Sequence, residues 1–133
     1  MTEPRKWFEF AQEDFIAAET MLEKGIYNPA CFHSQQGMEK RLKGFLRSQE
    51  QDFRKTHALV ELVAMCQRMD GSFSSLDEIC RKLDPYYIPT CYPDALPGAG
   101  PESLPDREEA EEAVALLRNG LQWIRRKMGL DLK

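Results

Sequence analysis

Apolar residues recur at spacings of three and four along most of this chain, the pattern of amphipathic helices. From Asn28 to Ser48, five residues share one side of a helix: Phe32, Gln35, Met38, Leu42 and Phe45. The same periodicity predicts helices near residues 3–24, 29–48, 57–69, 75–83 and 107–128. Because no strand pattern lies between them, we expect an all-α, up-and-down bundle of four to five helices.

Local signals predict where these helices begin and end. Gly25 is suited to the residue after a helix, and the short turn that follows makes the first two helices antiparallel neighbours. Asn28 and Thr56 are expected to cap the second and third helices. Ser75 and Asp106 are each followed three residues later by glutamate, which is the form of a capping box.

Residues 84–105 show no helical or strand period and hold six of the eight prolines. We interpret this segment as a long proline-rich loop within one domain that spans residues 1–133. Loops of this length are uncommon in compact domains unless they are functional or mobile. We expect Pro97–Pro101 to be its most mobile part, since it contains small residues and prolines but no large apolar side chain.

Composition describes a soluble globular protein rather than a disordered one. Hydrophobic residues make up 42% of the 133 residues and charged residues 30%. No apolar run approaches the roughly 20 residues that span a bilayer, so we expect no membrane segment and a cytoplasmic location. The net charge of −4 argues against attraction to nucleic acid by the whole molecule, although it leaves room for a local basic patch.

The cysteine pattern predicts neither disulfides nor a metal centre. No two of the four lie within ten residues of each other: Cys31, Cys66, Cys80 and Cys91. We therefore expect free thiols that pack as small apolar side chains, and no metal or cofactor.

The central helix carries a second stripe, which is cationic. Lys40, Lys43 and Arg47 follow one another at spacings of three and four. Gly37 and Gly44 lie seven residues apart on another side, and each costs about 1 kcal/mol of helix stability relative to alanine. Close approach of another backbone is the expected compensation.

Four segments in this order resemble the HEPN family (higher eukaryotes and prokaryotes nucleotide-binding). The central segment is Gln36-Gly37-Met38-Glu39-Lys40 with Leu42-Lys43. The others are the spaced residues Trp7, Ala11, Asp14, Ala18, Leu22, Gly25 and Tyr27; Lys55-Thr56-His57 with Leu59 and Leu62; and Tyr87 to Asp94. The resemblance covers roughly residues 7–128 and implies a helical bundle.

The resemblance implies two different functions. Many members are metal-independent ribonucleases with an arginine four to six residues before a histidine. Here His57 follows Arg54 after two residues and Arg47 after nine, and no arginine lies between Arg5 and His33. We therefore predict no catalytic residues, and instead a nucleotide- or RNA-associated binding module. Non-catalytic members of the family resemble partners of a separately encoded minimal nucleotidyltransferase in toxin–antitoxin-like systems.

The predicted phosphate- or nucleotide-binding face comprises Lys40, Lys43, Arg47, Lys55, His57, Tyr87 and Tyr92. The cations would hold phosphate, the tyrosines would stack a base, and a helix capped by Thr56 would add its positive end. The alternative is that the stripe is a solvated helix face and His57 only bonds a neighbouring carbonyl. Cys91 stands where the family pattern has an arginine, which removes one expected cation.

Two further interpretations stay open. One is a metal-independent ribonuclease with a rearranged site. The other is a purely structural homodimer, in which small residues such as Gly37 and Gly44 allow close helix–helix contact. A homodimer is expected under the binding interpretation as well.

Overall fold

The computed structural model describes residues 3–53, 55–87 and 104–129. Its α-helices are α1 (Glu3–Glu23), α2 (Tyr27–Ser48), α3 (Leu59–Met69), α4 (Asp77–Leu83) and α6 (Arg107–Met128). Two 3-10 helices flank α4: η1 (Gly71–Leu76) and η2 (Asp84–Tyr86). No strand occurs in these three ranges, and the predicted all-α fold is confirmed. The predictions for Cys91, Tyr92 and Pro97–Pro101 fall outside the described residues.

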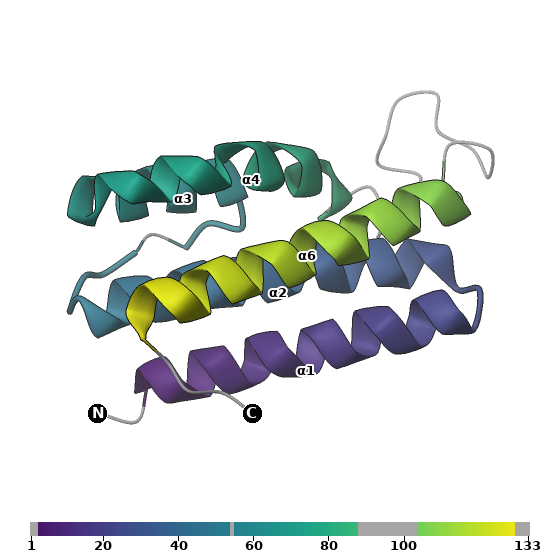
Figure 1. Ribbon diagram of the computed structural model, residues 1–133, viewed down its shortest axis with the longest axis horizontal. Coiled ribbons are helices and arrows are strands. Elements are labelled where there is room, and N and C mark those ends of the chain that lie inside the picture. Colours follow the sequence, from purple (N-terminus) through teal and green to yellow (C-terminus); the bar gives the residue numbers. More distant parts are fainter. Residues whose placement is uncertain (1–2, 54, 88–103, 130–133) are drawn as a thin grey trace.

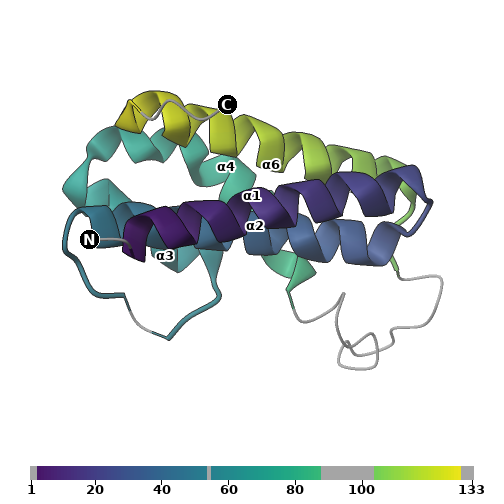
Figure 2. The same ribbon diagram turned by 90° about the horizontal axis from the view of Figure 1, so that it is seen from below.

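Helix α2 lies at the centre of the bundle. Helix α1 packs along it on one side, α6 runs beside it, and the α3–α4 pair lies on the side away from α1 (Figures 1 and 2). The core is continuous across these helices, with Met38 and Leu42 of α2 fully buried beside Leu62 of α3 and Leu117 of α6. The burial of Gln35, Met38, Leu42 and Phe45 accounts for the stripe predicted along this helix.

The turn between α1 and α2 has the geometry that Gly25 predicted. Gly25 has a positive φ of 77°, which a residue without a side chain adopts at little cost. The Gly25 N–H donates to the Leu22 carbonyl at 3.0 Å, and the Ile26 N–H donates to the Met21 carbonyl at 2.8 Å. These two bonds form a Schellman motif, which closes α1 and turns the chain directly into its antiparallel neighbour.

Three of the predicted N-caps are wrong. Helix α2 begins at Tyr27, so its N-cap is Ile26 and not Asn28. Helix α3 begins at Leu59 after Ala58, and the Thr56 hydroxyl only accepts from the Ala58 N–H at 3.1 Å. Ser75 lies inside η1, whose own start is capped by Asp70, and no side chain caps α4. The turn at Gly25 starts α2 earlier than expected, η1 includes Ser75, and the distant Asp84 carboxylate serves the start of α3.

The capping box of the last helix is confirmed. The Asp106 carboxylate accepts from the Glu109 N–H at 2.9 Å, and the Glu109 carboxylate accepts from the Asp106 N–H at 3.0 Å. At the other end, Gly129 has a φ of 67° and closes α6. The predicted range 107–128 is therefore the observed one.

Gly37 and Gly44 are buried within the chain, which corrects the idea that they are small exposed residues available to a second copy. A Cβ on Gly37 would lie 2.9 Å from Leu117 Cδ2, and one on Gly44 would lie 2.5 Å from Phe8 Cε1. The compensation for these glycines is close packing against side chains of α1 and α6 inside the bundle.

Cys31, Cys66 and Cys80 are free and buried, as predicted for three of the four cysteines. Among the described helices, none is long and apolar enough to cross a membrane.

Candidate functional site: a histidine–carboxylate face

The three cations of the predicted stripe are each paired with a carboxylate. Lys40 Nζ lies 2.6 Å from Asp14 Oδ2, and Lys43 Nζ lies 2.7 Å from Glu39 Oε2. Arg47 Nη1 lies 2.9 Å from Asp52 Oδ1. The stripe exists as the spacing indicated, but its positive charge is locally balanced by three negative charges.

The carboxylates of Asp14 and Glu39 also hold the two histidines of the chain. His33 Nδ1 lies 2.8 Å from Asp14 Oδ1, and His57 Nδ1 lies 3.1 Å from Glu39 Oε2. Each carboxylate thus joins one histidine to one lysine. We call this set the histidine–carboxylate face; its members are Asp14, His33, Glu39, Lys40, Lys43 and His57.

Burial differs sharply within the face. Asp14 and Glu39 are 7% and 4% exposed, whereas the side chains of His33 and His57 are 29% and 51% exposed. Lys43 is also buried, with its ammonium 5.8 Å from the Trp7 ring centre and 5.2 Å from that of Phe53. The carboxylates therefore form the floor of the site and the imidazoles its accessible part.

Helical spacing explains how α1 and α2 build this face. His33 and Lys40 are seven residues apart on α2, so they project from the same side two turns apart. Asp14 lies on the antiparallel helix α1, in line with the buried Ala11 and Ala18, and its two oxygens reach both side chains. The segment after α2 returns along it, because the His57 carbonyl accepts from Gln35 Nε2 at 2.9 Å. That bond brings His57 over Glu39.

The pairing fixes the proton on each imidazole. An ionised carboxylate accepts hydrogen bonds and cannot donate them, so each Nδ1 carries the proton. In the neutral ring, Nε2 is then the basic nitrogen, and neither Nε2 atom has a partner among the described residues. The arrangement can accept a proton at Nε2 or, once protonated, donate a hydrogen bond there.

A group of aromatic rings connects the two histidines. The Tyr87 ring stacks on His57 with centroids 4.4 Å apart and planes inclined by 13°. Phe32 contacts Tyr87 at 6.2 Å and His33 at 5.5 Å between centroids. The structure thus brings together His57 and Tyr87, which were predicted as site residues from two segments far apart in the sequence.

The remaining predicted site features, which are Lys55, Tyr92 and the start of α3, add little to the histidine–carboxylate face. Lys55 is exposed, and Tyr92 lies outside the described residues. The start of α3 is occupied, because the Asp84 carboxylate accepts from the Leu59 N–H at 2.7 Å and from the Val60 N–H at 3.3 Å. The expected contribution of a Thr56-capped helix start to phosphate binding is therefore corrected: a carboxylate from η2 takes that place.

Sequence reasoning missed Asp14, His33 and Glu39 as members of the site. A signal was present for Asp14, since a carboxylate between Ala11 and Ala18 in a buried stripe requires partners. Glu39 and Lys43 looked like an ordinary surface pair four residues apart. No group of three or more potential metal ligands occurs among the described residues.

Comparison with known proteins gives one family. The HEPN domain model matches residues 4–127. The crystal structure of TT1696 from Thermus thermophilus is similar at 37% identity and a TM-score of 0.84, covering 96% of this chain and 99% of that one. ST0689, an archaeal HEPN homologue, is similar at 27% identity and a TM-score of 0.76, with 96% and 98% covered. No curated protein matches. The chain belongs to the HEPN domain family.

Proposed function

We propose that this protein is an RNA- or nucleotide-binding module whose ligand lies on the histidine–carboxylate face. The observation that supports this most is the pair of partly exposed histidines, each held at Nδ1 by a buried carboxylate, with the Tyr87 ring stacked beside one of them. Single-stranded RNA is typically bound by stacking its bases on aromatic and histidine rings.

The charge balance of the face decides the expected mode of contact. Lys40 and Lys43 are neutralised by Asp14 and Glu39, so few uncompensated cations face a ligand. Ring stacking on Tyr87 and His57 and hydrogen bonds at the Nε2 atoms then supply most of the affinity. Because counterion release scales with the number of phosphates neutralised, we expect a weaker salt dependence than three unpaired cations would give.

Fluorescence anisotropy with a labelled 12-nucleotide single-stranded RNA, and competition by ATP, tests this proposal. Y87L keeps an apolar side chain but removes the ring, and we expect it to weaken RNA binding roughly tenfold. K40Q should weaken binding less than Y87L, because Lys40 is already paired with Asp14. K82Q is the matched control for K40Q, since Lys82 is also an ion-paired lysine but lies on α4. Equal affinity of Y87L and the wild type would place the ligand elsewhere, and no binding by the wild type would favour the structural homodimer.

A metal-independent ribonuclease is the second candidate. The specific observation is that both histidines present an unpartnered Nε2 among the described residues while a carboxylate orients the ring. Cleavage at the ribose 2′-OH needs a general base and a general acid, and imidazoles near neutral pH serve both roles. RNA cleavage in the presence of EDTA that is lost in His57→Ala would establish this activity; intact RNA after long incubation would exclude it.

The proposed partners follow from the family resemblance. They are a second copy of this chain and a separately encoded minimal nucleotidyltransferase, as in toxin–antitoxin-like pairs. Phe10 and Ile16 on α1 are 45% and 55% exposed and would be covered in such a complex. Light scattering of the purified protein, with and without a nucleotidyltransferase encoded beside it, tests both; a monomer in both samples would contradict them.

A further inference from the structure

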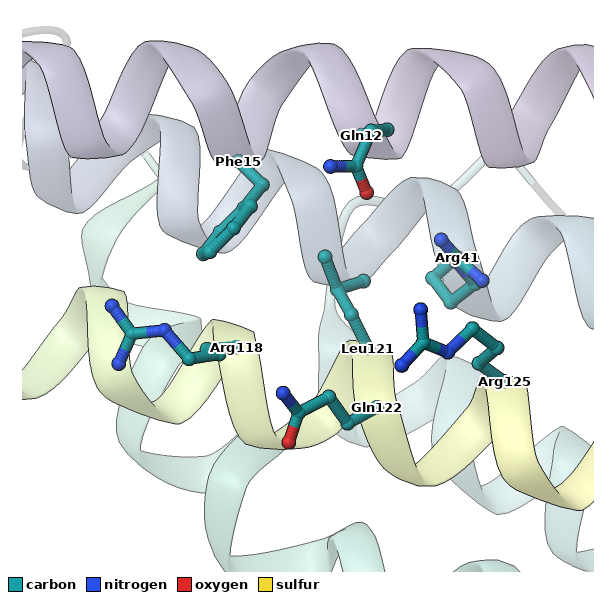
Figure 3. Close-up of a pocket in the computed structure, with 7 residues that line it drawn as sticks. All are labelled: Gln12, Phe15, Arg41, Arg118, Leu121, Gln122 and Arg125. Carbon is teal, nitrogen blue, oxygen red and sulfur yellow. The ribbon is translucent and has the colours of Figure 1, made fainter. Parts of the chain in front are cut away.

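A polar pocket opens between α1, α2 and α6 (Figure 3). Its volume is about 120 Å³, and its lining residues are Gln12, Phe15, Arg41, Arg118, Leu121, Gln122 and Arg125. Three of these seven carry guanidinium groups and none carries a carboxylate. Figure 3 shows the Arg125 side chain extending from α6 toward Arg41.

Arg41 is the unusual residue of this pocket. It is 1% exposed, and its Nε and Nη1 atoms have no hydrogen-bond partner in the described part of the chain. Its Cζ atom lies 4.8 Å from the Phe8 ring centre, so one face of the guanidinium contacts an aromatic ring. A buried cation without an acceptor is costly, since it loses hydration without regaining hydrogen bonds.

The electrostatic surroundings increase this cost. Burial, and secondly the nearby charge of Arg125, lower the pKa of Arg41 to about 10. Arg118 lies at the edge of the pocket, where it is exposed and pairs with Glu19 at 3.3 Å. Arg41 and Arg125 line this small space together with Arg118 and the amide groups of Gln12 and Gln122.

We propose that this pocket binds a single phosphate group, with Arg41 and Arg125 as its principal ligands. Guanidinium groups donate pairs of parallel N–H bonds that match the oxygens of a tetrahedral oxyanion. The two amide side chains supply further donors. Pockets for drug-sized ligands occupy about 300–1,000 Å³, so the observed volume suits one phosphate group and not a whole nucleotide.

This site is independent of the proposed RNA-binding face. Lys40 and Arg41 are adjacent in sequence, but Lys40 pairs with Asp14 whereas Arg41 lines the pocket together with residues of α1 and α6, and no residue of the histidine–carboxylate face lines it. Failure of RNA binding would therefore leave the phosphate site untouched, and the reverse also holds.

The test measures the melting temperature and calorimetric affinity of the wild-type protein in increasing inorganic phosphate, with ionic strength held constant by chloride. Ligand that binds only the folded state raises the melting temperature. We expect R125Q to weaken phosphate affinity at least about tenfold, and R118Q less. R126Q is the matched control, since Arg126 is the exposed next residue of the same helix and does not line the pocket. Equal responses in R125Q and R126Q, or no response beyond chloride in the wild type, would overturn the proposal.

A further arm identifies what the pocket recognises. Adenosine 5′-monophosphate is expected to compete with phosphate and adenosine is not; competition by adenosine would overturn the proposal.

Discussion

Asp84 caps α3 from 25 residues away, with its Oδ1 atom 2.7 Å from the Leu59 backbone nitrogen. Its Oδ2 atom accepts from the Val60 N–H at 3.3 Å, so one carboxylate serves two of the N–H groups that a helix start leaves unpaired. The negative charge also lies at the positive end of the helix dipole. The α4–η2 segment is thereby tied to the beginning of α3.

We expect Asp84→Ala to destabilise the protein by about 1–2 kcal/mol, the range for losing an N-cap. Urea denaturation monitored by circular dichroism measures this. Thr56→Ala is the control, because the Thr56 hydroxyl bonds only the Ala58 N–H outside the helix and should contribute less than about 0.5 kcal/mol. A larger loss in Thr56→Ala than in Asp84→Ala would contradict the observed capping.

Gly44→Ala is expected to destabilise by about 1–3 kcal/mol despite the better helix propensity of alanine. The new methyl group would lie 2.5 Å from Phe8 Cε1 and 3.0 Å from Trp7 Cβ, so the packed Phe8 ring or α1 itself must shift. Gly71→Ala is the matched control, since a Cβ there meets nothing within 4 Å. Thermal unfolding should show a lower melting temperature for Gly44→Ala and little change for Gly71→Ala; a stabilised Gly44→Ala would refute this packing.

Glu39→Leu is expected to lower the free energy of unfolding strongly, because it leaves the Lys43 ammonium buried and unpaired. The two side chains are 5% and 9% exposed, and breaking such a pair costs about 3–5 kcal/mol. Glu112→Gln breaks a surface contact with Lys82 and should cost less than about 1 kcal/mol. Gln36 Nε2 also donates to Glu39 Oε1 at 3.2 Å. The double variant Glu39→Leu/Lys43→Met should recover much of the loss in chemical denaturation, and no recovery would show that Glu39 acts through His57 or Gln36 instead.

The described cysteines are expected to be unreactive in the native state. Burial, assisted for Cys31 by the charge of Glu109, raises the pKa of the Cys31 and Cys66 thiols to about 12 from an ordinary 9.0. The thiolate is the reactive form, so DTNB at pH 8 should modify none of them rapidly in a Cys91→Ser variant. Three thiols should react after unfolding in urea, and fast reaction before unfolding would contradict their burial.

The raised pKa values of the Cys31 and Cys66 thiols also make the stability of the protein depend on pH. A folded-state pKa above the unfolded value means that the unfolded state loses its thiol protons first as pH rises. The contribution of these thiols to stability is therefore complete below about pH 9 and falls as pH rises from 9 toward 12. Urea midpoints measured across this range should decrease, and a flat profile would contradict the shifts.

The helices were predictable because each carries its own apolar period, and two of the helix ends were predictable because Gly25 and Asp106 act on residues next to them. Thr56 and Ser75 failed as caps for a different reason. A capping signal is short, and neighbouring turns or a distant carboxylate such as Asp84 compete for the same N–H groups. Local sequence does not record that competition.

The site was predictable only in part. Spacing placed Lys40, Lys43 and Arg47 on one stripe, but it could not show that α1 supplies Asp14 or that Trp7 and Phe53 cover Lys43. The burial of Arg41 could not be predicted from its spacing either. From sequence it is one more cation on a helix, and its burial follows from how α6 packs across α2.

Tyr87 stacks on His57, and Asp84 caps the helix that begins at Leu59. The two ends of the segment from His57 to Tyr87 therefore lie side by side. Closing a longer loop costs only slightly more entropy, since the cost grows with the logarithm of its length. Extra residues inserted at the exposed Gly71 should therefore leave the ring stack and the histidine–carboxylate face in register. Length can vary at this junction between α3 and η1 without any change in what the face presents, which makes it the natural position for a tag or a fused domain.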